Sequence, residues 1–287
     1  EDTMPSFAHQ IEGKRVGVSL AAGFFGFYHH AGVLTALEEN GITPVRLAGT
    51  SAGALTASLY ATGMKGREIG DFLVGLDRSD FWDVHWPWTR RGFGLLAGYR
   101  FSAALSKALA VHAFEECPIP LTVAAYDLGV GRVRHFSSGP LIPAVYASCA
   151  YPYLFTPAEI EGKHYWDGGF GEKTPLVPFL QPPEVDVVVV SYLPPSGEER
   201  DGVREFIPSL SSMWAFSPRA ERVERDRKSV ELLREADKRV LVCAPARVEL
   251  GPFSMDRAGQ AFEQGLAATR QMLDSEDEAV WGCEHLS

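Results

Sequence analysis

Four consecutive valines at residues 187–190 lie inside a mostly apolar stretch from Val185 to Leu193, which also contains Asp186 and Ser191. A continuous β-branched run of this length predicts a strand that is buried in the interior of a sheet. Further strands are expected at residues 14–20, 44–48, 121–126, 130–136, 159–166 and 239–243. Helices are expected at residues 27–40, 54–62, 66–77, 102–114, 141–150, 221–238 and 255–273. Strands that alternate with helices in this way are typical of a layered α/β fold.

The length and composition favour one large globular domain. The chain has 287 residues, of which 46% are hydrophobic and 22% are charged, as in ordinary globular proteins. The sequence contains no internal repeat, low-complexity tract or long linker. We therefore expect a single domain over residues 1–287.

The net charge and the cysteines limit which binding partners and which cellular location are expected for the protein. A formal net charge of −10 disfavours binding to nucleic acid and adsorption to anionic lipid, so any lipid contact should be local and apolar. No apolar run approaches the length of a transmembrane helix. The dispersed cysteines (Cys117, Cys149, Cys243 and Cys283) predict free thiols in a reducing cytosol. We expect a cytoplasmic or peripheral membrane protein. Because the sequence begins with Glu1 rather than methionine, a removed signal peptide stays open.

A glycine-bearing turn follows the first expected strand at residues 21–26, where backbone N–H groups commonly bind an anion. Its pattern, Ala21-x-Gly23-x-x-Gly26, lies where a dinucleotide fingerprint would lie, but the first glycine is missing. The second strand ends in residues 49–51, without the acidic residue that would bind a ribose. A phosphate-loop motif is also absent from the sequence. A bound nucleotide is therefore disfavoured.

The second strand leads into Gly49-Thr50-Ser51-Ala52-Gly53 and then a helix of small residues. A nucleophile elbow turns so sharply that the residues two positions either side of the serine must be small. Ser51 would stand at the carboxyl end of a strand, where open sheets place their sites. The pattern favours a nucleophilic serine, and the alternative is a tight turn with a capping serine.

A serine nucleophile needs a base, which is most often histidine. The order and context of the histidines disfavour a triad, since only His285 follows Asp167 and it lies near the chain end. His29 and His30 are interpreted as packing and surface residues of the first helix. The other candidate histidines are His85, His112, His135 and His164. They lack a suitable acid beside them or occur in the wrong chain order for a triad.

The alternative base is Asp167, which follows a strand and precedes Gly168 and Gly169. A carboxylate is a weak base, so this role requires a partly desolvated site and close contact with the serine hydroxyl. Taken alone, an aspartate before glycine is more often a turn residue.

Several stretches in this order resemble the patatin-like phospholipase family. They are the blocks at residues 21–26, 28–34, 37–39, 49–53, 121–127, 136–139, 147–152 and 165–169. The resemblance covers about residues 14–180, and the remainder would complete the sheet and helical layer. It implies a three-layer α/β/α sandwich with a central, mostly parallel mixed sheet.

The resemblance also implies a serine lipid acyl hydrolase of the phospholipase A, lysophospholipase or esterase type, which needs no metal or cofactor. By position, Ser51 would be the nucleophile and Asp167 the general base of an acyl-enzyme mechanism. The oxyanion would be held by backbone N–H groups in the loop of Ala22, Gly23, Phe24 and Phe25. The elbow would comprise Gly49, Thr50, Ala52 and Gly53, and the closing Asp-Gly-Gly motif would end with Gly168 and Gly169. The alternatives are a lipid acyltransferase and a catalytically weak or inactive lipid-binding or regulatory protein.

The oxyanion block departs from the usual family pattern. Ala21 and Ala22 replace two glycines, and Phe25 replaces a cationic residue. The apolar residues at positions 24 and 25 resemble the adipose triglyceride lipase branch more than plant patatins. Alanine keeps its N–H, but a loop that required positive φ at Ala22 would be strained.

Residues 81–101 are rich in tryptophan and leucine and are a candidate lipid-contact segment. The candidate residues are Trp82, Trp86, Trp88, Leu95 and Leu96. They would contact the lipid substrate and the surface of a membrane or lipid droplet. The alternative is a loop packed on the core.

Overall fold

The computed structural model describes residues 5–76, 83–84, 94–181, 184–194, 219–248, 250 and 255–276. The main sheet contains, in spatial order, β10 (Arg239–Cys243), β9 (Val187–Ser191), β1 (Val16–Leu20), β2 (Arg46–Thr50), β4 (Leu121–Asp127), β8 (Lys163–Asp167) and β7 (Ala158–Ile160). The strands from β10 to β4 are parallel, whereas β8, β7 and β5 (Arg132–Phe136) pair antiparallel. A second, small sheet pairs β3 (Gly94–Leu96) with β6 (Tyr153–Phe155).

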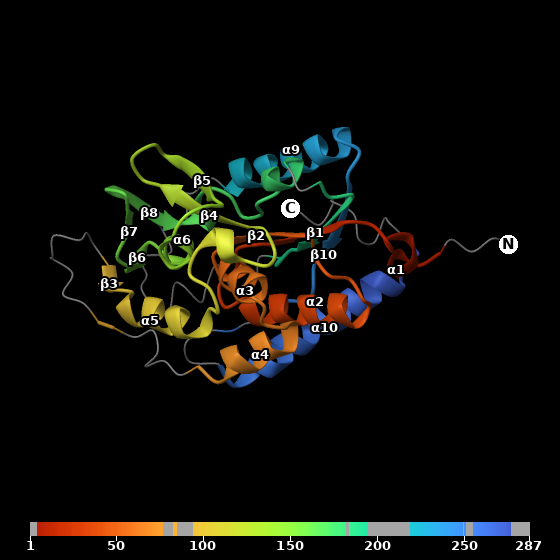
Figure 1. Cartoon of the computed structure of the whole chain (residues 1–287), viewed down its shortest axis with the longest axis horizontal. Coiled ribbons are helices and arrows are strands. Elements are labelled where there is room, and N and C mark those ends of the chain that lie inside the picture. The colour runs from red at the N-terminus through yellow and green to blue at the C-terminus, as the bar shows by residue number, and fades with distance from the viewer. Residues whose placement is uncertain are drawn as a thin grey trace.

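Helices cover both faces of the main sheet (Figure 1). One face carries α9 (Arg219–Glu235), and the other carries α2 (Phe27–Glu39), α3 (Ala52–Ala61), α4 (Gly66–Val74) and α10 (Ala258–Asp274). The remaining helices are α1 (Phe7–Gln10), α5 (Tyr99–Ala108) and α6 (Leu141–Cys149), with short 3-10 turns η2 (Phe114–Glu116), η3 (Gly168–Phe170), η4 (Val177–Leu180) and η6 (Met255–Arg257). The predicted three-layer fold with a mostly parallel mixed sheet is confirmed.

The four valines of β9 show why the sheet needs two helical layers. Val187 and Val189 belong to the larger core cluster, with residues of α2 and α10. Val188 and Val190 belong to a second cluster that includes Val230 of α9. Because successive side chains of a strand point to opposite faces, the unbroken run fills both cores at once.

The pairing of β4 with its neighbouring strands determines which residues meet at the candidate site. β2 pairs with β4 up to Thr50 opposite Ala124, and β8 pairs from Asp167 opposite the next residue, Ala125. β5 pairs with both parts of β4 and so occupies its other edge. β2 and β8 therefore meet end to end on one edge of β4, and this junction brings residue 51 beside Asp167.

Some boundaries differ from the sequence-based expectations. The single strand predicted at residues 159–166 is wrong, because β7 and β8 form a hairpin there. Its two turn residues, Glu161 (φ 52) and Gly162 (φ 73), have the positive φ angles of a type I′ turn. Glutamate rarely adopts such a φ, so residue 161 carried no turn signal. In addition, β2 begins and ends two residues after the predicted strand, α5 begins at Tyr99, and the short elements α1, β3 and β6 were not predicted.

Candidate active site

Ser51 lies at a sharp turn between β2 and α3. Its backbone has φ 55 and ψ −120, a combination that non-glycine residues seldom adopt. A Cβ atom on Gly53 would lie 2.0 Å from the Leu20 carbonyl oxygen, and one on Gly49 would lie 2.4 Å from the Gly53 carbonyl oxygen. Both positions therefore require glycine, and their backbones crowd the turn that exposes Ser51.

The Ser51 hydroxyl contacts the carboxylate of Asp167 directly. Ser51 Oγ donates to Asp167 Oδ2 at 2.5 Å, and Asp167 is only 5% exposed. The other carboxylate oxygen, Oδ1, accepts the Gly169 N–H at 2.8 Å. One oxygen of Asp167 thus performs the turn role suggested by the sequence, while the other is directed at the serine.

Gly168 has to be small because a Cβ atom there would lie 2.2 Å from the Ala124 carbonyl oxygen. The turn after Asp167 consequently packs directly against β4, next to the end of β2. This packing keeps the carboxylate at the junction of β2 and β8.

The loop of residues 21–26 lies beside the elbow, since Leu20 of β1 is paired with Gly49 of β2. The Ala22 N–H donates to the Lys173 carbonyl oxygen at 2.8 Å, so it is not free to bind an oxyanion as predicted. Among the described residues, no hydrogen bond uses the N–H groups of Gly23, Phe24 and Phe25. These three N–H groups are the available donors of the loop.

The alanines of this loop cause no strain. The positive φ lies at Phe25 (φ 54) and not at Ala22. Cβ atoms on Gly23 and Gly26 would lie 2.6 and 2.1 Å from a methyl carbon of Leu193, so a larger residue at either position would make that side chain shift. The replacement of two family glycines by alanine is therefore compatible with the observed backbone.

The buried His30 side chain connects the loop of residues 21–26 to β9 through two hydrogen bonds, a role that the sequence did not suggest. Both His29 and His30 are buried, so the prediction of a surface histidine in this pair is wrong. The Ala21 carbonyl can only accept, so His30 Nε2 carries a proton and donates to it at 2.8 Å. His30 Nδ1 then accepts from Ser191 Oγ at 2.7 Å. Burial lowers the pKa of His30 to about 3, so the imidazole that ties the loop to β9 is neutral at pH 7.

No histidine contacts Ser51 within the part of the chain that the structure describes. His135 Nε2 lies 2.5 Å from Glu172 Oε2, and His112 Nε2 donates to the Ser106 carbonyl oxygen at 3.1 Å. His85 and His285 lie outside the described residues. The described geometry thus pairs the serine with an aspartate.

Aromatic side chains surround the free N–H groups of the loop. Phe24 is 40% exposed, and its ring centre lies 4.8 Å from that of Phe25 and 6.0 Å from that of Tyr151. The Phe25 ring in turn lies 5.5 Å from the Phe27 ring. These rings give the loop an apolar side suited to a hydrocarbon chain. The same loop also has a polar contact, because Arg247 Nη2 donates to the Phe24 carbonyl oxygen at 3.1 Å.

The predicted lipid-contact residues divide into three groups. Leu95 is 37% exposed on β3, whereas Leu96 is 3% exposed and faces the interior, so the lipid role expected of Leu96 is not supported. Trp82, Trp86 and Trp88 lie outside the described residues.

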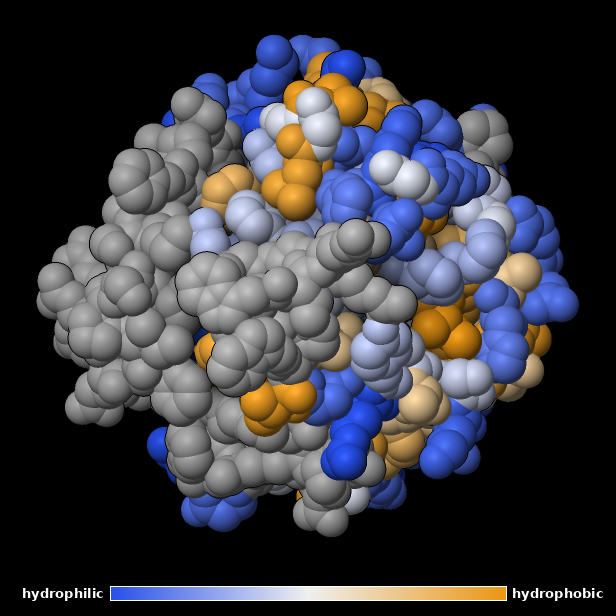
Figure 2. Space-filling model, turned by 90° about the vertical axis from the view of Figure 1, so that its left-hand side faces the viewer, coloured by the Kyte–Doolittle hydropathy of each residue, from blue (hydrophilic) through white to orange (hydrophobic). Residues whose placement is uncertain are grey.

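Figure 2 faces the end of the molecule that carries β3, β6 and β7, and its coloured apolar residues form separate patches among polar ones. Across the described helices, none has the length and apolar character needed to span a membrane.

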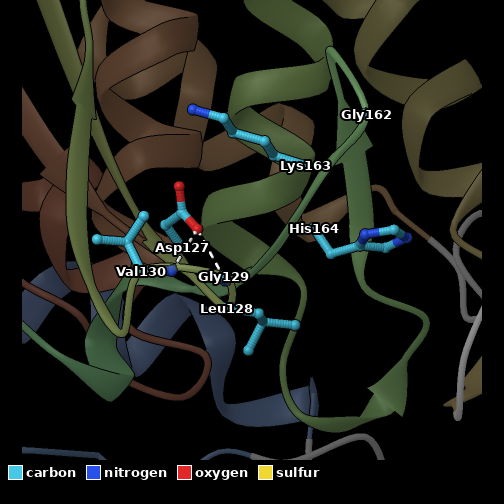
Figure 3. A pocket seen from close by; sticks show the side chains of 7 residues that line it. All are labelled: Asp127, Leu128, Gly129, Val130, Gly162, Lys163 and His164. Atoms are coloured by element: carbon cyan, nitrogen blue, oxygen red, sulfur yellow. Dashed lines mark hydrogen bonds between the residues drawn. The ribbon is translucent and has the colours of Figure 1, made fainter.

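A separate cavity of about 360 Å³ lies at the turns of the β4–β5 and β7–β8 hairpins. Figure 3 shows its lining residues, Asp127, Leu128, Gly129, Val130, Gly162, Lys163 and His164. The Asp127 carboxylate accepts the N–H groups of Gly129 at 2.9 Å and Val130 at 3.1 Å, so it stabilises the turn. Neither Ser51 nor Asp167 lines this cavity.

In the described ranges, no cluster of three or more histidine, cysteine or acidic residues could hold a metal ion.

Two buried acidic residues, Glu172 and Asp226, lie close to the turn formed by Asp167, Gly168 and Gly169. Glu172 follows η3, and its N–H donates to the Gly168 carbonyl oxygen at 2.9 Å. Asp226 of α9 is 3% exposed. Burial, and secondarily the charge of Glu172, raises the pKa of Asp226 from 3.8 to about 7. The folded protein therefore retains a proton on Asp226 at a pH at which the unfolded chain has lost it.

This shift predicts a stability that falls as the pH rises. Between the unfolded and folded pKa values the folded state binds more protons, so stability is lost as the pH approaches 7. From about pH 5.5 to pH 8, we expect the unfolding free energy of the wild type to fall by roughly 2 kcal/mol more than that of Asp226→Asn. Denaturant unfolding at several pH values measures this difference. The exposed Asp71→Asn is the control, and an equal pH dependence in wild type and Asp226→Asn would contradict the prediction.

Comparisons with known proteins show the family and the fold. The family described as "Patatin-like phospholipase" matches residues 18–180. An uncharacterized NTE family protein of Mycobacterium tuberculosis is 30% identical over 200 residues, which cover 70% of this chain and 54% of that protein. Lysophospholipase NTE1 of Cryptococcus neoformans is 26% identical over 221 residues, which cover 73% of this chain and 13% of that protein.

Among solved structures, VipD from Legionella pneumophila is similar in fold. The TM-score is 0.55 at 18% sequence identity, and the match covers 92% of this chain and 67% of VipD. The chain spans about half the length of the mycobacterial relative and a smaller part of the fungal one.

Proposed function

This chain belongs to the patatin-like phospholipase family, and from that premise we propose that it is a serine lipid acyl hydrolase with a Ser51–Asp167 dyad. The observation that carries the proposal is the 2.5 Å contact between Ser51 Oγ and Asp167 Oδ2 at a strained, glycine-lined elbow. Such a contact allows a carboxylate to take the serine proton during attack.

The proposed reaction has two steps. Asp167 accepts the proton of Ser51 as Oγ attacks the ester carbonyl, and the tetrahedral oxyanion accepts hydrogen bonds from free N–H groups of residues 23–25. A donor of this kind contributes about 3 kcal/mol to the transition state in comparable enzymes. Asp167 returns the proton to the departing alcohol, which leaves an acyl ester on Ser51. Asp167 then deprotonates the water that hydrolyses this ester, and the proton finally returns to Ser51 Oγ.

The aromatic surroundings support a lipid acyl ester as the substrate. Phe24, Phe25 and Tyr151 present ring surfaces next to the proposed oxyanion donors. A fungal relative is named a lysophospholipase, and we extend phospholipase A, lysophospholipase or esterase activity to this chain as a proposal. Contact with a membrane or lipid-droplet surface, a cytoplasmic or peripheral location and a single domain stay predictions from the sequence.

Labelling of the wild-type protein tests the proposal. A fluorophosphonate probe should attach covalently, and peptide mass spectrometry should locate the adduct on Ser51. Incubation with lysophosphatidylcholine and with a soluble short-chain ester should release free fatty acid, and heat-unfolded protein serves as the control. If the folded protein is neither labelled nor able to hydrolyse these esters, the proposal is overturned. The protein would then be a non-catalytic lipid-binding relative. Acylated acceptor lipid without free fatty acid would identify an acyltransferase instead.

A further inference from the structure

The carboxyl end of α6 contacts the backbone of both proposed catalytic residues. Ser148 Oγ accepts the Ser51 N–H at 2.8 Å, and Cys149 Sγ donates to the Ser51 carbonyl oxygen at 3.3 Å. The Ala150 carbonyl oxygen accepts the Asp167 N–H at 2.9 Å. Three successive residues thus hold the backbones of a dyad in which Ser51 follows β2 and Asp167 ends β8.

The Ser148 hydroxyl also occupies a position in the main sheet. In the β2–β4 ladder the Leu47 N–H donates to the Pro120 carbonyl oxygen at 2.9 Å. Parallel strands repeat this bond every second residue, so two repeats further along the Ser51 N–H would donate to the Ala124 carbonyl oxygen. Instead, Ser148 Oγ accepts from the Ser51 N–H and donates to Ala124 at 2.6 Å. One side-chain hydroxyl is inserted where a direct bond between the strands is expected.

This insertion occurs at the junction where β8 replaces β2 along the edge of β4. Ser148 is fully buried, so the Ser51 N–H and the Ala124 carbonyl would lose their partner if the hydroxyl were absent. The direct way to restore pairing is for Ser51 to move toward Ala124. That movement would draw the elbow toward β4 and change the position of Ser51 Oγ relative to Asp167.

We infer that Ser148 is a positioning residue for the proposed hydrolase, because its hydroxyl holds the Ser51 backbone at the distance at which Asp167 can take the serine proton. The inference rests on the proposed function. Ser148 acts through Ser51 and has no substrate contact assigned to it. Displacements on the order of 1 Å in such sites lower rates by about 100-fold, so an effect on the chemical step is expected.

The test compares Ser148→Ala with Ser148→Thr, which keeps the hydroxyl, and with Ser229→Ala. Ser229 is a matched control because it is a buried helical serine whose Oγ donates to the Arg225 carbonyl oxygen at 2.9 Å. The measurements are kcat and KM for the soluble ester, the rate constant of fluorophosphonate labelling, and the unfolding temperature. All rates are measured well below the unfolding temperature of each variant, so that loss of folded protein does not imitate loss of catalysis.

Ser148→Ala is expected to lower both kcat and the labelling rate by about 10- to 100-fold while KM changes less than about twofold. Ser148→Thr should recover most of the rate, and Ser229→Ala should match the wild type. Wild-type rates in folded Ser148→Ala, or a change confined to KM, would overturn the inference. If Ser148→Ala does not fold, Ser148→Cys, with a weaker hydrogen-bonding group of similar shape, is judged by the same criteria. An unlabelled and inactive wild type would instead reject the proposed function itself.

Discussion

Ser51→Ala is expected to abolish fluorophosphonate labelling and to lower ester hydrolysis by at least about 1,000-fold while the protein stays folded. The substitution removes the protein atom that the proposed mechanism uses as its nucleophile, and it keeps the Cβ atom and the backbone of the elbow. Asp167 Oδ2 loses the hydrogen bond from Ser51 Oγ, which costs on the order of 1–3 kcal/mol in a nearly buried site. Labelling stoichiometry, fatty-acid release and circular dichroism measure the three parts of this expectation.

Ser58→Ala is the matched control for this substitution. Ser58 is a buried serine of α3, and its Oγ donates to the Leu55 carbonyl oxygen at 2.8 Å. The Ser58→Ala variant loses a serine hydroxyl from the helix that directly follows Ser51, and Ser58 has no role in the proposed dyad. Hydrolysis that persists in Ser51→Ala, or a probe adduct found on another residue, would show that the nucleophile lies elsewhere.

The parts of the fold predicted correctly are those that follow from local patterns. The valines at 187–190 identify a strand buried on both faces, and the small residues around Ser51 identify a turn that excludes larger side chains. The clash that requires glycine at position 49 is with the Gly53 carbonyl oxygen, four residues away, so it can be read without tertiary information. The clash that requires glycine at position 53 is with the Leu20 carbonyl oxygen of β1, which the local pattern does not show. The proximity of Ser51 and Asp167 was suggested by the family resemblance rather than by any local pattern.

The parts that were missed depend on contacts between distant segments. Ser148 and Ser51 are 97 residues apart, and His30 and Ser191 are 161 residues apart, so no short pattern marks either pair. Whether the Ala22 N–H is free depends on the Lys173 carbonyl, which becomes known only once the strands are assembled. These residues determine which backbone groups stay available at the site, and that information is tertiary.

Asp167→Asn is expected to lower kcat by about 1,000-fold or more and to slow fluorophosphonate labelling similarly, with little change in KM. Asparagine has nearly the same shape, but its amide nitrogen cannot accept a hydrogen bond. The Gly169 N–H needs an acceptor, so the amide oxygen should face Gly169 and the NH2 group should face Ser51 Oγ. The serine would then receive a donor where the proposed mechanism requires a base. Single-turnover kinetics on the soluble ester separates this loss from slow product release.

Asp127→Asn provides the matched control, because Asp127 is also a buried aspartate that accepts backbone N–H groups at a strand end and has no contact with Ser51. Its substitution should affect stability but not kcat. If both variants lost activity in proportion to their stability, Asp167 would be a turn residue only. If Asp167→Asn stayed fully active, the base would be another group, and His85 and His285, outside the described residues, would be the next to substitute. A loss confined to Asp167→Asn, with the fold retained, is the result that only the dyad predicts.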